Sequence, residues 1–227
     1  FQAAGASGSA AGGMKVMLGG AIAGGVWKDM RATGQVSASW DGDTFTANAP
    51  AGATIGWTEA VYGDTRFGAA EISYRPTGVF ARGKAGSVTG QGSLGEVVIP
   101  VSAEGFTASA RLGATGINWR AANGVRATFD MQPSSVDLKL DTEAIAIAIN
   151  DIKGNLALDR GWKVSGEATG GAVTSSTVLL SDLKGKFDLA GEGDKLSGSL
   201  SEVATHIADA LTGAGKRFEE ANFAGGA

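Results

Sequence analysis

The stretch VRATFDMQPSSVDLKLDTEAIAIAINDIKGNLALDRGWK (residues 125–163) decides the fold class, because its apolar and polar residues alternate with a period of two. Phe129 and Met131 alternate with polar residues in its first segment, and Leu138 and Leu140 do so in its second. A period of two is the strand period, so each segment has one polar and one apolar face. The breaks between segments contain Gly, Pro, Asn or Asp, which are turn residues.

The same pattern extends in both directions and predicts about 20 short strands with no helices between them. We expect strands at 14–23, 34–40, 43–48, 53–58, 65–75, 77–82, 87–94, 96–101, 104–112, 115–121, 124–131, 134–141, 143–149, 151–159, 161–169, 172–180, 182–190, 194–201, 202–208 and 216–223. Strands in series pair as hairpins or as a meander. The sequence therefore predicts an all-β fold with one long, mostly antiparallel sheet and a continuous apolar side. At about 4.8 Å per strand, its edge would be on the order of 95 Å long.

The pattern divides the chain into two parts. Residues 1–13 are rich in Gly, Ala and Ser and predict a flexible end, whereas residues 14–227 predict one continuous sheet. Within the sheet, SEVATHIADALTG (residues 201–213) also has the apolar spacing, the Ser cap and the closing Gly of a short helix. Because the alternation continues from Leu196 to Ile207, we predict a strand and a loop there.

A weak internal repeat supports a single sheet. IKGNLALDRGWKVSGEA (residues 152–168) is similar to LKGKFDLAGEGDKLSGSL (residues 183–200), and each unit is a strand, a polar turn and a second strand. Repetition at this spacing predicts stacked hairpins, in which each unit contacts only its neighbours.

Composition excludes several classes of function. The chain has 37 glycines among 227 residues, only 19% charged residues and a net charge of −4, and no basic stripe with interleaved aromatic residues is visible. We therefore expect no nucleic-acid partner. There is no cysteine, and His206 is the single histidine, so a thiolate metal site, a multi-histidine metal site and a Ser-His-Asp triad lack their residues.

No local motif supports an enzyme. GVFARGKA (residues 78–85) nearly fits a phosphate-binding loop, but Ala85 replaces the Ser/Thr and no helix pattern follows. Asp41 and Asp43 lack the spacing of a calcium loop, and SDLK (residues 181–184) begins a predicted strand. We expect no catalytic residue, no cofactor and no metal ion.

The sequence shows no membrane-spanning segment. Its most apolar run, residues 16–27, is shorter than the roughly 20 residues that a transmembrane helix needs. The chain begins at Phe1 without a signal sequence, so we expect it to be a piece of a longer protein whose signal or anchor lies elsewhere.

The repeat units quoted above resemble those of the bacterial AsmA-like superfamily, which includes the TamB and YdbH branches. IGWTEAVYGDTRFGAAEISYRP (residues 55–76) and GSVTGQGSLGEVVIPV (residues 86–101) resemble the YdbH branch in particular. The similarity covers about residues 55–223, and more loosely 14–54. It implies a strongly curled sheet that forms an open groove with an apolar interior. It also implies a periplasmic protein that passes phospholipids between the inner and outer membranes, contacting both through regions outside this chain.

The apolar positions that are in phase with apolar neighbours are the candidates for lining such a groove. They are Phe129, Met131, Leu138, Leu140, Ile145, Ile147, Ile149, Leu156, Leu158, Phe187, Leu189, Leu196 and Leu200. The five tryptophans lie on or beside predicted strands, where they would pack against the sheet or line the groove. The alternative is a structural or adhesive β-solenoid, whose inner face fills itself with stacked side chains and needs no ligand.

Overall fold

The computed structural model describes residues 7–22, 25–84, 86–192, 195–211, 217–218 and 221–225. Within these residues there are 21 strands and no helix, and all of the strands belong to one sheet. The predicted all-β class is therefore confirmed. In chain order the strands are β1 (Ser7–Ile22), β2 (Gly25–Asp41), β3 (Thr44–Asn48), β4 (Ala53–Trp57), β5 (Glu59–Tyr62), β6 (Thr65–Phe67), β7 (Ala70–Pro76), β8 (Ala81–Lys84), β9 (Ser87–Leu94), β10 (Val97–Ala103), β11 (Phe106–Leu112), β12 (Thr115–Ala122), β13 (Gly124–Met131), β14 (Ser134–Leu140), β15 (Ala144–Ile149), β16 (Asp151–Leu158), β17 (Trp162–Thr174), β18 (Val178–Glu192), β19 (Lys195–Leu211), β20 (Arg217–Phe218) and β21 (Ala221–Gly225).

The sheet is an antiparallel meander of long rungs, each made of one bent strand or of two or three strands in line. Consecutive strands β9 and β10 form one rung, and the returning rung pairs β11 with β10 and β12 with β9. In chain order the rungs are β1, β2, β3–β4–β5, β6–β7–β8, β9–β10, β11–β12, β13–β14, β15–β16, β17, β18, β19 and β20–β21. These twelve described rungs span about 53 Å, not the 95 Å expected, because many strands lie end to end rather than side by side.

Every rung from β2 through β19 has a bend at a common line along the sheet, which we call the corner line. At each bend the alternation slips by one residue. In β17, for example, Ala168 lies opposite Gly185 but Gly171 lies opposite Leu183, which leaves one extra residue in β17. The slips occur at residues 28–29, 58–59, 68–69, 95–96, 113–114, 132–133, 150–151, 169–170, 181–182 and 201–202.

The extra residue bends the strand while keeping the apolar residues on one face. Without it, apolar residues on the two sides of the bend would point to opposite faces of the sheet. The long strands accommodate the extra residue by left-handed backbone at Asp29 (φ 50°), Gly170 (φ 66°), Asp182 (φ 53°) and Glu202 (φ 53°). The corner line thus folds a single sheet into a trough.

Buried polar groups along the corner line are hydrogen-bonded. Ser134 is 8% exposed; its Oγ accepts a hydrogen bond from the Gly113 amide at 3.0 Å and donates one to the Gln132 carbonyl at 3.0 Å. Thr115, 4% exposed, donates to the Gly113 carbonyl at 3.0 Å. The bond between Gly113 and Ser134 ties adjacent rungs together where the strand ladder is interrupted, and the other two are local bonds within one rung.

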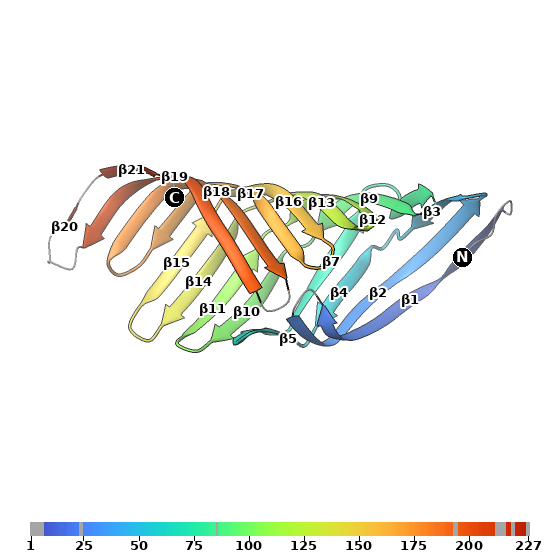
Figure 1. Cartoon of the computed structure of the whole chain (residues 1–227), viewed down its shortest axis with the longest axis horizontal. Helices are drawn as coiled ribbons and strands as arrows, with labels where there is room; N and C mark the ends of the chain where they lie inside the picture. The colour runs from blue at the N-terminus through green and yellow to red at the C-terminus, as the bar shows by residue number, and fades with distance from the viewer. Residues whose placement is uncertain are drawn as a thin grey trace.

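The trough has two walls, which meet at the corner line. The first wall contains β3, β4, β7, β8, β9, β12, β13, β16 and residues 162–168 of β17, 185–192 of β18 and 195–201 of β19. The second wall contains β5, β6, β10, β11, β14, β15 and residues 171–174 of β17, 178–181 of β18 and 203–211 of β19. In Figure 1, strands β10, β11, β14 and β15 occupy the lower side of the molecule and β9, β12, β13 and β16 the upper side.

The apolar face is the inner face of the trough. In β15 (AIAIAI) the isoleucines are half-buried, whereas the alanines on the other face are exposed although they are smaller. The same alternation runs through β12 and most of β16. The sheet is therefore curled with its apolar side inward, as expected.

Several predicted boundaries were wrong. Residues 7–13, expected to be a flexible end, belong to β1 and pair with residues 35–41 of β2, while residues 1–6 lie outside the described part. The expected strand 172–180 is interrupted by a turn between β17 and β18, and the expected strands 194–201 and 202–208 are one strand, β19. The strand predicted at 202–208 is confirmed, whereas residues 209–211, expected in the loop, continue β19, and residues 212–213 lie outside the described part.

The antiparallel meander also differs from a β-solenoid, in which successive coils stack in parallel. Every described strand pair is antiparallel. The repeat at about 31 residues corresponds to a pair of rungs, one running away from and one returning to the same edge.

Candidate functional site

The inner face of the first wall consists of apolar rows that cross the strands. Residues directly opposite each other in adjacent strands face the same side, so the register defines each row. One row is Ile117, Phe129, Gly154, Gly166, Phe187 and Leu200. The next is Trp119, Ala127, Leu156, Val164, Leu189 and Gly198. Each row continues without a charged residue across six strands.

The predicted lining residues share this inner face. On the first wall lie Phe129, Met131, Leu156, Leu158, Phe187, Leu189 and Leu200. On the second wall lie Leu138, Leu140, Ile145, Ile147 and Ile149. The side chain of Leu196 lies outside the described part, although its backbone is opposite Gly191. Twelve of the thirteen predicted lining residues thus share one face of the sheet, even though the phase of the alternation changes at every corner.

This inner face remains open to solvent. Leu140 and Leu189 are each 40% exposed and Leu200 is 63% exposed, and no large side chain in the described part is fully buried. The accessible surface is 13882 Å², whereas a compact protein of this mass would expose about 9,500 Å². The apolar side chains therefore line a groove and do not fill a closed core.

Aromatic rings lie over glycines along the floor of this groove. A Cβ atom at Gly154 would lie 2.8 Å from Cζ of Phe129, its register partner, and one at Gly166 would lie 2.9 Å from Cζ of Phe187. Trp119 occupies the space over Gly90 in the same way. Because each ring uses the room left by a missing side chain, it covers the sheet without filling the groove. Sequence reasoning missed these pairs, since only the register shows which glycine faces which ring.

One end of the groove is more closely packed. Trp57 is 7% exposed, donates from Nε1 to the Gly68 carbonyl at 2.9 Å and meets Trp27 edge to face at 5.2 Å between ring centroids. Tyr74 meets Phe80 in the same way at 5.5 Å. At this end, aromatic side chains fill space between the walls, which is the sheet-packing role considered for the tryptophans.

The mouth of the trough is bridged at one point. The Tyr62 hydroxyl, at the end of β5 on the second wall, donates to the Lys195 carbonyl of β19 on the first wall at 3.2 Å. In Figure 1 the β18–β19 hairpin accordingly reaches down toward β5. The trough is thus closed across its mouth at this point.

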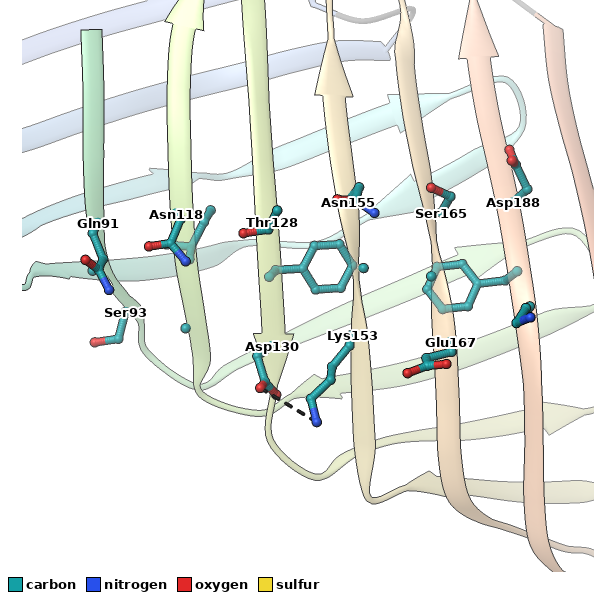
Figure 2. A pocket seen from close by; sticks show the side chains of 18 of the residues that line it. Gln91, Ser93, Asn118, Thr128, Asp130, Lys153, Asn155, Ser165, Glu167 and Asp188 are labelled. Carbon is teal, nitrogen blue, oxygen red and sulfur yellow. Dashed lines mark ion pairs between the residues drawn. The ribbon is translucent and has the colours of Figure 1, made fainter. Parts of the chain in front are cut away.

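The outer face of the first wall is polar, as Figure 2 shows, with strands of the rest of the sheet behind it. Along it Lys153 pairs with Asp151 at 2.9 Å and Asp130 at 3.9 Å, and Lys186 pairs with Glu202 at 2.7 Å. A hydrogen bond to Asp151, then the charge of Asp130, raises the pKa of Lys153; hydrogen bonding to Glu202 raises that of Lys186. These exposed pairs therefore favour the charged form of both lysines.

The described part of the chain also places the remaining residues that the sequence analysis considered. No group of His, Cys, Asp and Glu there is suited to hold a metal ion, and no helix there could span a membrane. His206 lies half-buried in β19, opposite Ser181. Asp41 and Asp43 lie at the turn between β2 and β3.

Comparison with known proteins does not assign the chain to a family. No protein-family model, curated protein or solved structure matches it. Its function must therefore be inferred from the groove itself.

Proposed function

We propose that this chain is a segment of a bridge-like lipid-transfer protein of the AsmA-like kind. Its inner face would bind phospholipid acyl chains, and the longer protein would support phospholipid transport between the inner and outer membranes of a bacterium, in the periplasm. The chain would act without catalysis and without a cofactor.

One observation carries this proposal: the continuous apolar inner face is left open. A closed core removes its apolar side chains from water, whereas this face leaves Leu189 40% and Leu200 63% exposed. Burying apolar surface is worth about 25 cal/mol per Å², so an exposed strip of this kind is stabilised by an apolar occupant. Acyl chains suit a long strip, because they are apolar, flexible and able to slide without specific contacts.

The first experiment is mass spectrometry of organic extracts of the purified protein, combined with photo-crosslinking. A photo-reactive side chain at Leu156 is expected to capture lipid, and one at Asn155 is not. These neighbours on β16 face opposite sides of the same wall, so Asn155 is a matched control. Leu138 with Lys139, and Phe187 with Lys186, give equivalent pairs on β14 and β18. Equal capture on both faces would contradict the proposal.

The second experiment interrupts the apolar strip. The double variant Leu138→Asp/Leu156→Asp is expected to keep its far-ultraviolet spectrum and solubility, since the carboxylates border an open groove. It is also expected to lose bound lipid, because charged groups interrupt the path of the acyl chains. Leu138→Ala/Leu156→Ala should retain most of it. If the Asp variant unfolds while the wild type carries no lipid, the inner face is a self-filled core and the proposal fails.

A further inference from the structure

The outer face of the first wall carries a row of cations that the proposed function does not use. Arg82 of β8, Arg120 of β12, Arg126 of β13 and Lys163 of β17 lie in one register row, with Thr89 and Ala157 between them. Five strand spacings separate the ends of the row, which is therefore about 24 Å long. The sequence alone does not predict this row, because its four charged members come from four different strands.

These cations line a hollow of about 980 Å³ that contains no carboxylate. Below the cation row, the same strands contribute a second row of amide and hydroxyl groups. This second row is Gln91, Asn118, Thr128, Asn155 and Ser165. In a chain of net charge −4, a hollow with four cations, no acid and a floor of hydrogen-bond donors is a local reversal of charge.

The positions of the arginines are unfavourable for folding alone. Arg120 and Arg126 are direct cross-strand partners, and like charges in that arrangement destabilise a sheet. Within the described residues, Arg82 and Arg126 make no ion pair, Arg120 donates from Nε to Ser87 Oγ at 3.1 Å, and Lys163 pairs with Asp188 at 2.9 Å. An anionic ligand would relieve the repulsion between the two arginines.

The neighbouring hollow provides a contrast on the same wall. It has a similar volume, about 970 Å³, but Asp130, Glu167 and Asp188 line it together with Lys153 and Lys186. Figure 2 shows Asp130, Lys153 and Glu167 in this order along neighbouring strands, so that acid and base alternate. Its three carboxylates outnumber its two lysines, so the excess of cations is specific to the hollow around Arg120 and Arg126.

We propose that this outer hollow binds an anionic ligand with two or more phosphate groups. Arg side chains bind phosphate oxygens through paired N–H groups, and the amide and hydroxyl row beneath them can donate further hydrogen bonds. One phosphate reaches only the adjacent Arg120 and Arg126, whereas the length of the row suits several. The phosphates could come from a soluble polyphosphate or from the head groups of a lipid surface. The site is on the opposite face from the groove and does not depend on acyl-chain binding there.

The test measures binding of two probes to the whole chain. Inorganic tripolyphosphate is titrated by calorimetry, and vesicles of phosphatidylglycerol in phosphatidylcholine are compared with pure phosphatidylcholine by co-sedimentation. We expect binding to tripolyphosphate if the phosphate group itself is recognised, and binding only to anionic vesicles if a head-group layer is required. Either result supports the site.

Arg120→Gln/Arg126→Gln should weaken that binding by at least about tenfold. The control Arg111→Gln/Lys139→Gln removes the same charge from the outer face of the second wall and should change binding less than about twofold. The Arg120→Gln/Arg126→Gln variant should also keep or raise the wild-type unfolding midpoint, because it removes a like-charge pair. The proposal is overturned if neither probe binds, or if both double variants lose the same affinity. It is also overturned if duplex DNA binds more tightly than both probes, or if the unfolding midpoint of Arg120→Gln/Arg126→Gln falls below wild type. Lipid extracted from the groove is measured in parallel and should be the same in all variants.

Discussion

The corner between β4 and β5, around Trp57 and Ala60, and the region from β16 to β19 are built by the same meander, yet they differ in packing. In the first, Trp57 is 7% and Ala60 3% exposed, and aromatic rings meet edge to face. In the second, Leu189 is 40% and Leu200 63% exposed. Both have a corner line and an apolar inner face, so what differs is the filling of the space between the walls.

This difference shows that curling the sheet does not by itself create a core. Where aromatic side chains project between the walls, the trough is filled and stability comes from burial. Where rings lie over glycines, as Phe187 does over Gly166, the trough stays open and stability comes mainly from the strand ladder. The packed corner around Trp57 is thus suited to stabilise the fold, and the open region from β16 to β19 is suited to bind an apolar ligand. The following changes should separate the two regions.

The largest difference is expected from a buried charge. Ala60→Asp places a carboxylate at a site that is 3% exposed and should reduce the free energy of unfolding by about 4 kcal/mol, or prevent folding. Leu189→Asp, at a site that is 40% exposed, should cost about 1 kcal/mol. Urea unfolding followed by circular dichroism measures both. Similar costs would mean that the two ends are packed alike.

Removing a large side chain should give the next largest difference. Trp57→Ala loses a buried ring, its hydrogen bond to the Gly68 carbonyl and its contact with Trp27, at a cost of about 3–4 kcal/mol. Leu200→Ala removes a side chain that is already 63% exposed and should cost less than about 1 kcal/mol. Thermal unfolding monitored at a far-ultraviolet wavelength compares the two variants. A greater loss for Leu200→Ala would show that the β19 side is the structural core.

The ring-over-glycine pairs predict a smaller effect within the open region. A Cβ at Gly154 would lie 2.3 Å from the Ser165 carbonyl oxygen and 2.8 Å from Phe129, so Gly154→Ala should cost about 1–3 kcal/mol. At Gly185 the nearest atom would be 3.4 Å away, and Gly185→Ala should be neutral or stabilising by a few tenths of a kcal/mol. Unfolding midpoints in urea distinguish the two. Equal tolerance of alanine would indicate that both the Phe129 ring and the neighbouring strand at Ser165 can shift to make room.

The smallest effect concerns pH. A hydrogen bond from Lys28, with the charges of Lys28 and Arg66, lowers the pKa of Glu59. A lowered folded-state pKa contributes stability that is present above the unfolded value and is lost as pH falls through the folded one. The unfolding midpoint of Glu59→Gln should therefore lie slightly below wild type at pH 7 and match it in acid, below the lowered pKa. A difference that persists in acid would assign the effect to lost hydrogen-bond geometry.

At the open end the direction reverses. The raised pKa of Lys186, caused first by its hydrogen bond to Glu202, contributes stability below the ordinary lysine value that is lost as pH rises through the folded one. The unfolding midpoint of Lys186→Gln should therefore lie slightly below that of the wild type at pH 7, and the two midpoints should converge only in strong alkali. Convergence of this variant in acid rather than alkali would contradict the assignment. Protonation of Glu59 and deprotonation of Lys186 thus weaken contacts in two different parts of the trough.

Much of the fold could be read from the sequence, since strand period is a local property. Strands at 87–94, 115–121, 124–131 and 151–159 were located within about a residue of β9, β12, β13 and β16. Their pairing could not be read, because a bend within a rung and a hairpin between rungs both interrupt the alternation. Gly95 at a bend and Gly105 at a hairpin look alike in the sequence, yet only Gly105 has a positive φ, at 79°.

The candidate site was predictable to the same extent. The apolar face could be assigned, because each segment carries its own alternation and apolar residues gather on one side. The open state of the groove could not, since exposure depends on how far apart the walls stand. The cation row from Arg82 to Lys163 could not be predicted from the sequence either, because the register that aligns its members is set by long-range strand pairing.

The contact between Tyr62 and Lys195 has a consequence for the order of folding. The strand pairs join neighbouring rungs, so they close short loops and can form one hairpin after another. The Tyr62–Lys195 bond joins residues 133 positions apart. It becomes available only after the intervening rungs have stacked and the corner line has bent them, because until then the two residues are at distant edges of the sheet. Folding should accordingly proceed as a zipper along the chain, with the mouth bridged in the final step.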